Sequence, residues 1–385
     1  MEFPRLNSQG NSLCTGRMRI AFYAPLKPPD HAVPSGDRQI ARLFLAALRL
    51  AGHELVLVSR FRSYEGYGET PRQARLAMLG ERIADHLLCR YREFRELTPE
   101  LWFSYHVYHK APDWLGPAVA GGLGVPYVVA EASVTPTQRC GNWAAGHRAV
   151  EGAIRQADAV IGLNSEDREC ILPLLREPWR WVALKPFVDA STYGRKGEPG
   201  GGPPRLITVA MMRQGDKLAS YRLLSDALCR LLDLPWSLEV IGDGPARWDV
   251  ENAFAPLNER VTWMGSLDHA AIAERLAVAD LFVWPACNEA FGMAMLEAQA
   301  GGLPVVAGAV GGVGEIVVSG VTGLLVAPGD ALAFAEAVRS AILDSRQRSA
   351  FAKAARQRVL IEHNLPTAAR RLAAVIDAVG HDCGA

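Results

Sequence analysis

Glu289 and Glu297 flank a segment whose residue types suit a phosphorylated, hydroxyl-rich ligand. A buried strand is expected just before them at Leu281–Trp284, and a helix is expected to begin near Gly292. The free N–H groups of that helix start would bind an anion, and Gly292 lets the backbone approach it closely. One of the two carboxylates could then meet hydroxyls at one end of the anion, and the second could meet hydroxyls at the other end. The alternative is an amphipathic helix with two solvated acids. The expected strands on both sides, the second at Leu303–Val306, favour a binding site.

Two cationic residues, Arg213 and Lys217, follow another expected strand at Leu206–Ala210. They would lie in a strand-to-helix turn, where side chains reach a ligand. Arginine binds phosphate oxygens as a fork and lysine acts as a point charge, so the pair suits a diphosphate. Ordinary surface charge is the alternative. The chain has no D-x-D motif for a divalent metal, so we expect no metal ligands. The two cations would then support activity without a metal ion.

Glycines at further strand ends are weaker signals, because tight turns use glycine for structural reasons. Gly36 would open the first helix, and Gly242 follows the expected strand at Leu238–Ile241. A third group, Gly311–Gly314, follows Val305–Val306. None of these loops completes G-x-G-x-x-G, which counts against a dinucleotide-dependent dehydrogenase.

The elements around these residues alternate between short apolar runs and helical patterns. The expected strands are Arg19–Ala24, Glu54–Ser59, Pro126–Ala130, Ala159–Leu163, Arg205–Ala210, Leu238–Gly242, Val261–Met264, Leu281–Trp284, Pro304–Ala307 and Gly323–Val326. The expected helices are Asp37–Ala51, Arg72–Leu97, Leu218–Leu232, His269–Ala279, Met293–Ala300, Ala331–Leu343 and a tail over Ser349–Val379. Such alternation predicts an α/β protein with parallel sheets, in which ligands bind at the carboxyl ends of the strands.

One segment interrupts this alternation. Residues 194–204 are almost all glycine, proline or charged, which is typical of a linker. We therefore predict two doubly wound, Rossmann-like domains that face a central cleft. Their expected bounds are a disordered leader at 1–17, an N-terminal domain at 18–193, a linker at 194–204, a C-terminal domain at 205–362 and a final helix at 363–385 that could pack back on the N-terminal domain.

The composition limits the classes of partner. Among 385 residues, 41 Lys and Arg balance 41 Asp and Glu, which argues against a nucleic-acid-binding protein. No apolar run reaches the roughly 18 residues of a membrane-spanning helix, and the first residues lack the apolar core of a secretory signal. We expect a cytoplasmic protein. The Arg-rich stretch Arg72–Arg95 leaves peripheral contact with the inner membrane face open, although its acidic residues favour a solvated helix.

Together these motifs resemble the retaining, nucleotide-sugar-dependent glycosyltransferases of family 4, called glycosyl transferases group 1, which have the GT-B fold. The resemblance is strongest over Arg205–Asp330, in the Arg213/Lys217 pair, the Gly242–Pro245 turn, the EAFGMAMLE run at 289–297 and the glycine loop at 311–315. It is looser over Met18–Asp189, where it rests on Gly36, on Gly52–Leu55 and on the PFVD run at 186–189.

The resemblance implies a role for each matching residue. Arg213 and Lys217 would hold the diphosphate of the donor, and Glu297 would bind the ribose hydroxyls. Glu289 and the backbone of Ala290, Phe291 and Gly292 would hold the transferred sugar and the phosphates. Met264 and Gly265 would lie beside the base, Gly242 would belong to the donor-binding domain, and Gly36 would lie near the diphosphate. A UDP-sugar is the commonest such donor, and it is a co-substrate, so no cofactor is expected.

The sequence departs from the family pattern in two places. The Arg-to-Lys spacing is four positions instead of the usual five. Where the family commonly has a histidine that touches the donor sugar, near Pro126–Ala130, this chain has Glu131. His106 is a neighbouring candidate, so either side chain could line the site. His106 and His109 could instead form a metal pair, but no third ligand is in view.

These features predict transfer of a sugar to a hydroxyl of a glycan, a lipid-linked acceptor or a small molecule. Two alternatives stay open at this point: a nucleotide-sugar epimerase-like enzyme and a non-catalytic nucleotide-sugar-binding protein. Sugar turnover without an acceptor would indicate the first, and tight nucleotide binding without any transfer would indicate the second.

Overall fold

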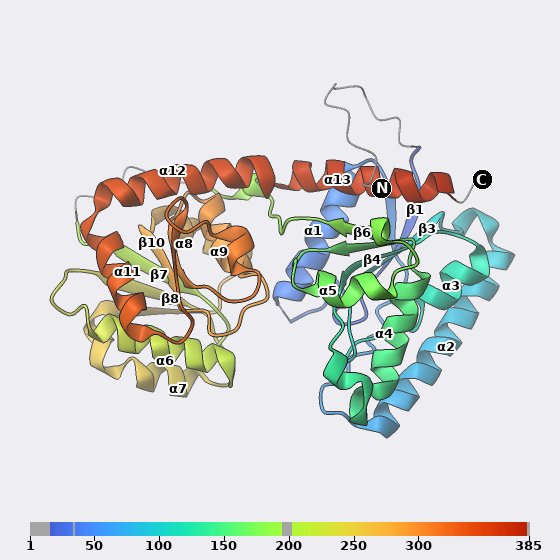
Figure 1. The fold of residues 1–385 in the computed structure, drawn as a ribbon, viewed down its shortest axis with the longest axis horizontal. Helices are drawn as coiled ribbons and strands as arrows, with labels where there is room; N and C mark the ends of the chain where they lie inside the picture. The colour runs from blue at the N-terminus through green and yellow to red at the C-terminus, as the bar shows by residue number, and fades with distance from the viewer. Residues whose placement is uncertain (1–15, 34, 195–201, 383–385) are drawn as a thin grey trace. The chain divides into compact units, whose positions relative to one another are not determined.

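The computed structural model describes residues 16–33, 35–194 and 202–382. The chain divides into two compact units (Figure 1). Unit 1 comprises Met1–Leu184 together with Leu365–Ala385, and unit 2 comprises Lys185–Asn364. Most of the expected leader at 1–17 and of the expected linker at 194–204 lies outside the described residues.

Unit 1 is built on a parallel sheet with the strand order β2-β1-β3-β4-β5-β6. Every strand in it runs in the same direction, so the strand ends that precede the helices meet at one edge. The strands are β1 (Arg19–Tyr23), β2 (Glu54–Leu57), β3 (Leu101–Val107), β4 (Tyr127–Ala132), β5 (Ala159–Gly162) and β6 (Trp181–Ala183). The helices are α1 (Gly36–Leu50), α2 (Thr70–Glu93), α3 (Gly116–Leu123), α4 (Ala144–Gln156), α5 (Asp167–Ile171) and α13 (Leu365–Asp382).

Unit 2 repeats this plan with the strand order β12-β11-β10-β7-β8-β9, again all parallel. Its strands are β7 (Arg205–Val209), β8 (Ser237–Ile241), β9 (Val261–Gly265), β10 (Leu281–Trp284), β11 (Val305–Gly308) and β12 (Gly323–Val326). Its helices are α6 (Asp216–Cys229), α7 (Arg247–Ala253), α8 (His269–Val278), α9 (Met293–Ala300), α10 (Val313–Ile316), α11 (Ala331–Leu343) and α12 (Ser345–Glu362). The two sheets confirm the predicted pair of doubly wound α/β domains.

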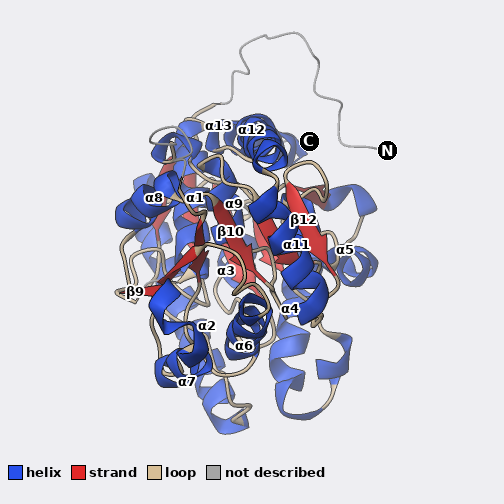
Figure 2. Ribbon diagram, turned by 90° about the vertical axis from the view of Figure 1, so that its left-hand side faces the viewer, coloured by secondary structure: helices blue, strands red, loops and turns tan. Residues whose placement is uncertain are grey.

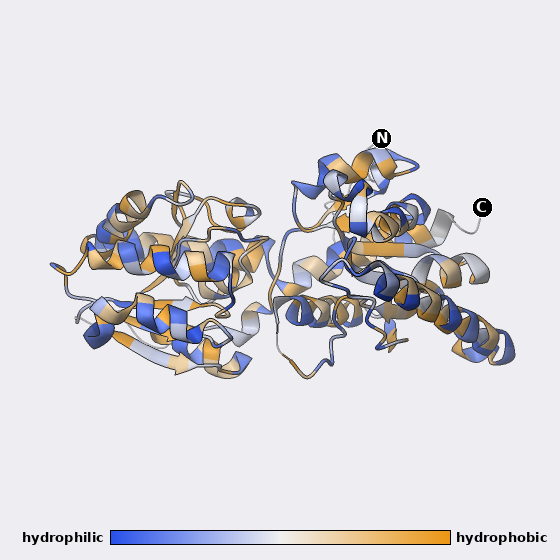
Figure 3. Cartoon of the chain, turned by 90° about the horizontal axis from the view of Figure 1, so that it is seen from below, coloured by the Kyte–Doolittle hydropathy of each residue, from blue (hydrophilic) through white to orange (hydrophobic). Residues whose placement is uncertain are grey.

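Helices cover the sheets, as the blue helices around the red strands show in Figure 2. In α1, Ile40, Leu43, Phe44 and Leu48 are buried on one face, which matches a repeat of 3.6 residues. Figure 3 shows helices that carry both hydrophilic and hydrophobic residues along their length. Helix α13 packs against α1, so the end of the chain completes unit 1.

Side-chain caps fix where several helices begin. The Ser35 hydroxyl accepts a hydrogen bond from the N–H of Arg38 at the start of α1. Asp268 and Asp330 cap α8 and α11 in the same way, accepting from Ala271 N–H and Ala333 N–H. Such a cap stabilises a helix by about 1 kcal/mol. The cap of α1 matters most here, because α1 is the first helix after β1 and its first turn contains the predicted residue Gly36.

The structure contains elements that the sequence patterns did not predict. Strands β3 and β6 and helices α3, α4, α5, α7 and α10 were not expected. Strand β3 is central and contains Ser104, which lies buried between Trp102 Nε1 (2.9 Å) and the carboxylate of Asp113. This polar, aromatic sequence lacks the continuous apolar run of a buried strand. The helix expected at Arg72–Leu97 ends at Glu93 instead, because the backbone of Phe94 leaves the helical conformation.

The expected tail helix is two helices that belong to different units. The break falls at His363, whose ring is fully buried and whose Nδ1 lies 2.8 Å from the carbonyl of Pro186. The boundary between the two units falls after Leu184, whereas the sequence pattern placed it at residue 193. Val188 N–H donates to the carbonyl of His363, and Tyr193 OH lies 2.8 Å from His269 Nε2, so Lys185–Tyr193 belong to unit 2.

Helices long enough to cross a bilayer do occur in the described part of the chain, but none of them is apolar enough to do so. In α2, Leu87 and Tyr91 are buried, while the arginines of the helix are exposed.

Candidate functional site

The turn after β7 and the loop after β10 bring Lys217 and Glu289 together in unit 2. Lys217 lies in the first turn of α6, and its Nζ donates to Glu289 Oε2 at 2.5 Å. The indole N–H of Trp284, the last residue of β10, donates to the same oxygen at 3.2 Å. The Lys217 ammonium also lies 5.3 Å from the centre of the Trp284 ring. Parallel strands end at one edge of the sheet, which is why residues 72 positions apart meet here.

Hydrogen bonds fix the loop that carries Glu289. The N–H of Cys287 donates to Ser220 Oγ at 3.0 Å, and Asn288 Nδ2 donates to Asp216 Oδ2 at 2.8 Å, which joins the loop to α6. On its other side the N–H of Gly312 donates to the carbonyl of Ala290 at 2.8 Å. A side chain at Gly311 would collide with the Glu289 carbonyl. The glycine loop after β11 therefore supports the Glu289 loop.

Helix α9 begins directly after this loop with an unusual backbone conformation. Gly292 precedes the helix at φ 76°, a left-handed backbone conformation that strains other residues and favours glycine. The first N–H groups of a helix have no partner within it. Gly292 and Met293 at this helix start line a cavity of about 50 Å³ together with Lys217 and Glu289. This combination of an ammonium and free N–H groups suits an anion.

Glu297 lies one turn further along α9 and is buried, with 8% of its surface exposed. Burial raises its pKa to about 7, an effect that a hydrogen bond from Tyr193 partly offsets. Tyr193 OH also lies 2.8 Å from Nε2 of His269, whose Nδ1 is 3.9 Å from Glu297 Oε1. Because a tyrosine hydroxyl has one proton, it donates to one of these partners and accepts from the other. Tyr193 thus holds Glu297 in place by a hydrogen bond, and His269 lies beside them.

The other predicted residues of unit 2 lie at the same edge of the sheet. Gly242 follows β8, and a Cβ there would collide with the carbonyl of Ala210, so the fold itself requires glycine at this position. Its N–H donates to the carbonyl of Gly265 at the end of β9, beside the half-buried Met264.

Arg213 is exposed in the turn after β7, and no side-chain partner is seen for it among the described residues. The final two predicted residues are Ala290, which is exposed, and Phe291, which is buried.

Unit 1 places its predicted residues at the carboxyl edge of its own sheet. Gly36 is the first residue of α1. The next residue, Asp37, contacts His106, with 3.0 Å between Asp37 Oδ1 and His106 Nδ1. His106 and Glu131 both have positive φ, 60° and 63°, at or near the ends of β3 and β4. Within the described residues, the other non-glycine residue with positive φ is Ala286, in the loop before Glu289. Such backbone strain clusters at functional sites.

The chain is similar to known proteins over most of its length. Residues 203–358 match the family described as glycosyl transferases group 1. A glycogen synthase of Mycobacterium tuberculosis is 31% identical over 287 residues, covering 69% of this chain and 67% of that protein. This chain belongs to the glycosyl transferases group 1. It is a glycosyltransferase of family 4, and family membership favours a transferase over an epimerase.

Solved structures agree with this glycosyltransferase assignment at the level of the fold. A sucrose-phosphate synthase from Thermosynechococcus elongatus has a TM-score of 0.73 at 19% identity, over 95% of this chain and all of that one. The Anabaena protein HepE, in complex with UDP and glucose, has a TM-score of 0.70 at 16% identity, over 94% of this chain and all of that one. The fold is therefore GT-B.

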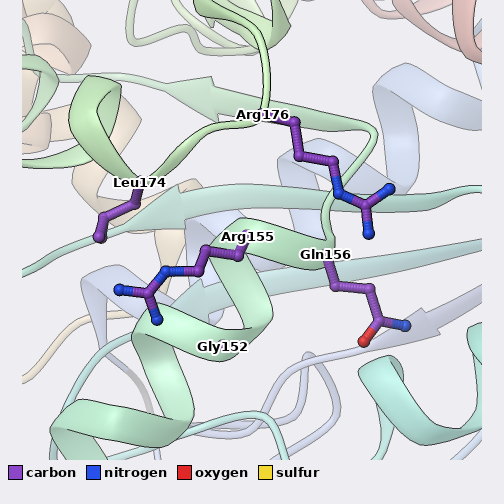
Figure 4. Close-up of a pocket in the computed structure, with 5 residues that line it drawn as sticks. All are labelled: Gly152, Arg155, Gln156, Leu174 and Arg176. Carbon is purple, nitrogen blue, oxygen red and sulfur yellow. The ribbon is translucent and has the colours of Figure 1, made fainter.

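A cavity of about 670 Å³ in this glycosyltransferase lies away from the predicted residues. Figure 4 shows its lining residues Gly152, Arg155 and Gln156 on α4 together with Leu174 and Arg176. These segments come just before β5 and β6, at the amino-terminal edge of the sheet. Ligands in parallel α/β sheets bind at the opposite edge, so this cavity is not the candidate active site.

Four residues near the candidate sites of the glycosyltransferase were not found from its sequence. Trp284 ends an expected strand and was interpreted only as buried. Tyr193 and His269 meet Glu297 from distant positions, and no spacing signals that contact. Asp37 lies next to Gly36, and an acidic residue in the first turn of a helix is usually explained by the helix dipole.

The suggested metal pair of His106 and His109 does not form a metal site. His106 contacts Asp37, whereas the ring of His109 packs against Trp143 with 5.4 Å between ring centres. Nowhere in residues 16–33, 35–194 and 202–382 do three or more His, Cys, Asp or Glu side chains gather in a way that could hold a metal ion.

Proposed function

We propose that this glycosyltransferase moves a sugar, with retention of configuration and without a metal ion, from a nucleoside-diphosphate sugar to an acceptor hydroxyl. A UDP-sugar is the proposed donor, and a glycan, a lipid-linked molecule or a small molecule is the proposed acceptor. The observation that carries the proposal is the Lys217–Glu289 pair at the start of α9, one turn before Glu297. This arrangement offers positive groups for a diphosphate and a carboxylate on either side of it.

The protein's main contribution in this proposal is electrostatic. As the bond between the sugar and the diphosphate breaks, negative charge grows on the leaving diphosphate. Lys217, Arg213 and the first N–H groups of α9 stabilise that charge, as fixed donors do for other developing anions. The acceptor hydroxyl attacks from the face the diphosphate leaves, and its proton passes to a phosphate oxygen. No protein base is then needed for this step.

Donor binding would have to separate Lys217 from Glu289. Lys217 Nζ and Glu289 Oε2 are 2.5 Å apart, so no phosphate oxygen fits between them in this arrangement. The phosphates would replace Glu289 as the partner of Lys217. Glu289 would then be free to accept hydrogen bonds from the sugar hydroxyls. Each group exchanges one partner for another, so neither is left buried and unpaired.

Two of the similar proteins support this choice of donor. HepE is seen with UDP and glucose, and the M. tuberculosis relative is a glycogen synthase. A hexose on UDP is therefore the first donor to test with this chain.

The decisive experiment uses UDP-glucose with and without excess EDTA. We expect UDP release to continue in EDTA, because Lys217 and Arg213 take the place of a divalent ion. In the absence of acceptor, slow transfer to water should first give α-glucose, which proton NMR detects through the anomeric signal. Loss of activity in EDTA with rescue by Mg²⁺ or Mn²⁺, or initial formation of β-glucose, would contradict the proposal.

A further inference from the structure

Unit 1 gathers acidic side chains at the carboxyl edge of its sheet. Asp37 lies in the first turn of α1, Glu131 near the end of β4, and Asp167 at the start of α5 just after β5. His106 of β3 lies among them, with its Nδ1 3.0 Å from Asp37 Oδ1. Electrostatic interactions connect Glu131 with His106, Asp167 and Asp37. We call these four residues the acidic cluster.

Two polar groups in this region are buried without partners. Glu131 is 8% exposed, and its Oε2 has no hydrogen-bond partner among the described residues. The hydroxyl of Tyr105, which is 1% exposed, also lacks a partner and interacts electrostatically with Glu131 and Asp37. Buried polar groups in native proteins are nearly always paired. Two unpaired groups that point to one cluster indicate that the cluster is completed by a ligand.

The charges of the cluster identify the class of ligand. Three carboxylates face two cations, His106⁺ and Lys27, the second of which interacts with Asp37. If all of these groups are ionised, one negative charge is left over, and the exposed Glu166 adds to it beside Asp167. A ligand with one positive charge would balance the buried part of the cluster. The side chains of Asp37 and His106 are 37% and 23% exposed, so the cluster is open to solvent on their side.

We propose that the acidic cluster binds a protonated amine of the acceptor, so that the glycosyltransferase prefers an amine-bearing, hydroxyl-rich acceptor. This inference rests on the proposed function, because it names the acceptor of that reaction. An ammonium group fits better than a metal ion, since the cluster is not arranged as a metal-ligand set within the described residues. An ammonium group has three donors, which would serve Glu131 Oε2 and a second carboxylate at once.

The titration of Glu131 gives a signature of this binding. Burial, with smaller contributions from Asp167 and Asp37, raises its pKa to about 8 against the lowering effect of His106. Glu131 is therefore mostly protonated in the free protein at neutral pH. A bound ammonium would favour the carboxylate and lower that pKa. Binding of the cation should then release close to one proton, whereas a neutral ligand should release none.

The experiment compares three probes that differ mainly in one group: glucosamine, N-acetylglucosamine and glucose. Calorimetry on the full chain at about pH 6.5, in two buffers of different ionisation enthalpy, gives the affinity and the protons released. We expect glucosamine to bind about tenfold or more tightly than the two neutral probes, with proton release for glucosamine alone. Added salt should reduce the difference.

Two variants decide whether the cluster is responsible. Glu131→Gln, which keeps the side-chain size, should abolish both the preference for glucosamine and the proton release. Glu93→Gln, at an exposed position on α2, should leave both unchanged. Equal affinity for the three probes, no binding of glucosamine, or an unchanged preference in Glu131→Gln would overturn the proposal.

A separate measurement distinguishes this outcome from failure of the proposed function. In the proposed function Lys217, Arg213 and Glu297 of unit 2 hold UDP. Glu131→Gln should therefore still bind UDP, and this binding also shows that the variant is folded. If UDP binds and glucose is transferred but the amine preference is absent, only the acceptor inference fails. If UDP does not bind to the parent chain, the proposed function fails as well.

Discussion

Replacement of Lys217 by methionine should lower the rate of UDP release from UDP-glucose about a hundredfold to a thousandfold. The ammonium donates to Glu289 at 2.5 Å at the start of α9, where the leaving diphosphate gains charge in our proposal. Loss of one fixed donor from such a position costs about 2.7–4 kcal/mol of transition-state stabilisation. Arg213→Ala should cause a loss of the same order, because in our proposal its guanidinium binds the same diphosphate. Steady-state kinetics with the purified variants measures both effects.

The matched control is Lys353→Met on α12, an exposed lysine outside the site. It should keep the parent rate, which separates the loss of a particular ammonium from a general change in net charge. Near-normal turnover in both Lys217→Met and Arg213→Ala would show that the diphosphate binds elsewhere. Lys217→Met also leaves Glu289 without its cation, so thermal unfolding should be recorded for each variant.

Glu297→Gln should weaken UDP binding and at the same time stabilise the protein at alkaline pH. Burial raises the pKa of Glu297 from 4.5 to about 7. At pH values between these two, the carboxyl of Glu297 is protonated in the folded protein and ionised in the unfolded chain. Stability therefore falls as pH rises through this window. At about pH 8 ionisation of the buried carboxyl lowers the free energy of unfolding by about 3 kcal/mol. The glutamine variant has no such loss. At about pH 4 the two proteins should unfold alike, because the parent carboxyl is then protonated in both states.

Affinity for UDP should follow the opposite trend with pH. A carboxylate accepts two ribose hydroxyls better than a carboxylic acid does, so UDP affinity of the parent should rise as pH passes through about 7. Tyr193→Phe removes the hydrogen bond that lowers the pKa of Glu297, so the midpoint of that rise should move to higher pH. Titration calorimetry across pH measures the midpoint. A pH-independent affinity, or a Glu297→Gln variant that binds UDP normally, would remove Glu297 from the nucleotide site.

The sequence was sufficient to predict the fold class and all six strands of unit 2. Strands such as Leu281–Trp284 are short apolar runs between turn residues, which is the pattern of a buried parallel strand. Strand β3 was missed because Ser104 is buried through its hydrogen bonds with Trp102 and Asp113, so a polar residue interrupts the apolar run. Local pattern could not show these partners.

For the candidate site, the sequence indicated individual residues but not the contacts between them. Lys217 and Glu289 were chosen separately, from strand ends and the family resemblance, and the structure joins them in one ion pair. The contact of Tyr193 and His269 with Glu297 depends on tertiary packing and leaves no spacing in the sequence. The boundary expected at residue 193 was misplaced for the same reason, because the contacts that hold this segment in unit 2 come from residues far along the chain.

A crystal structure of the protein with UDP tests the central claim most directly. We predict phosphate oxygens within hydrogen-bond distance of Lys217 Nζ and Arg213, the ion pair with Glu289 broken, and the ribose hydroxyls on Glu297. A nucleotide bound away from the start of α9, with Lys217 still on Glu289, would contradict the account.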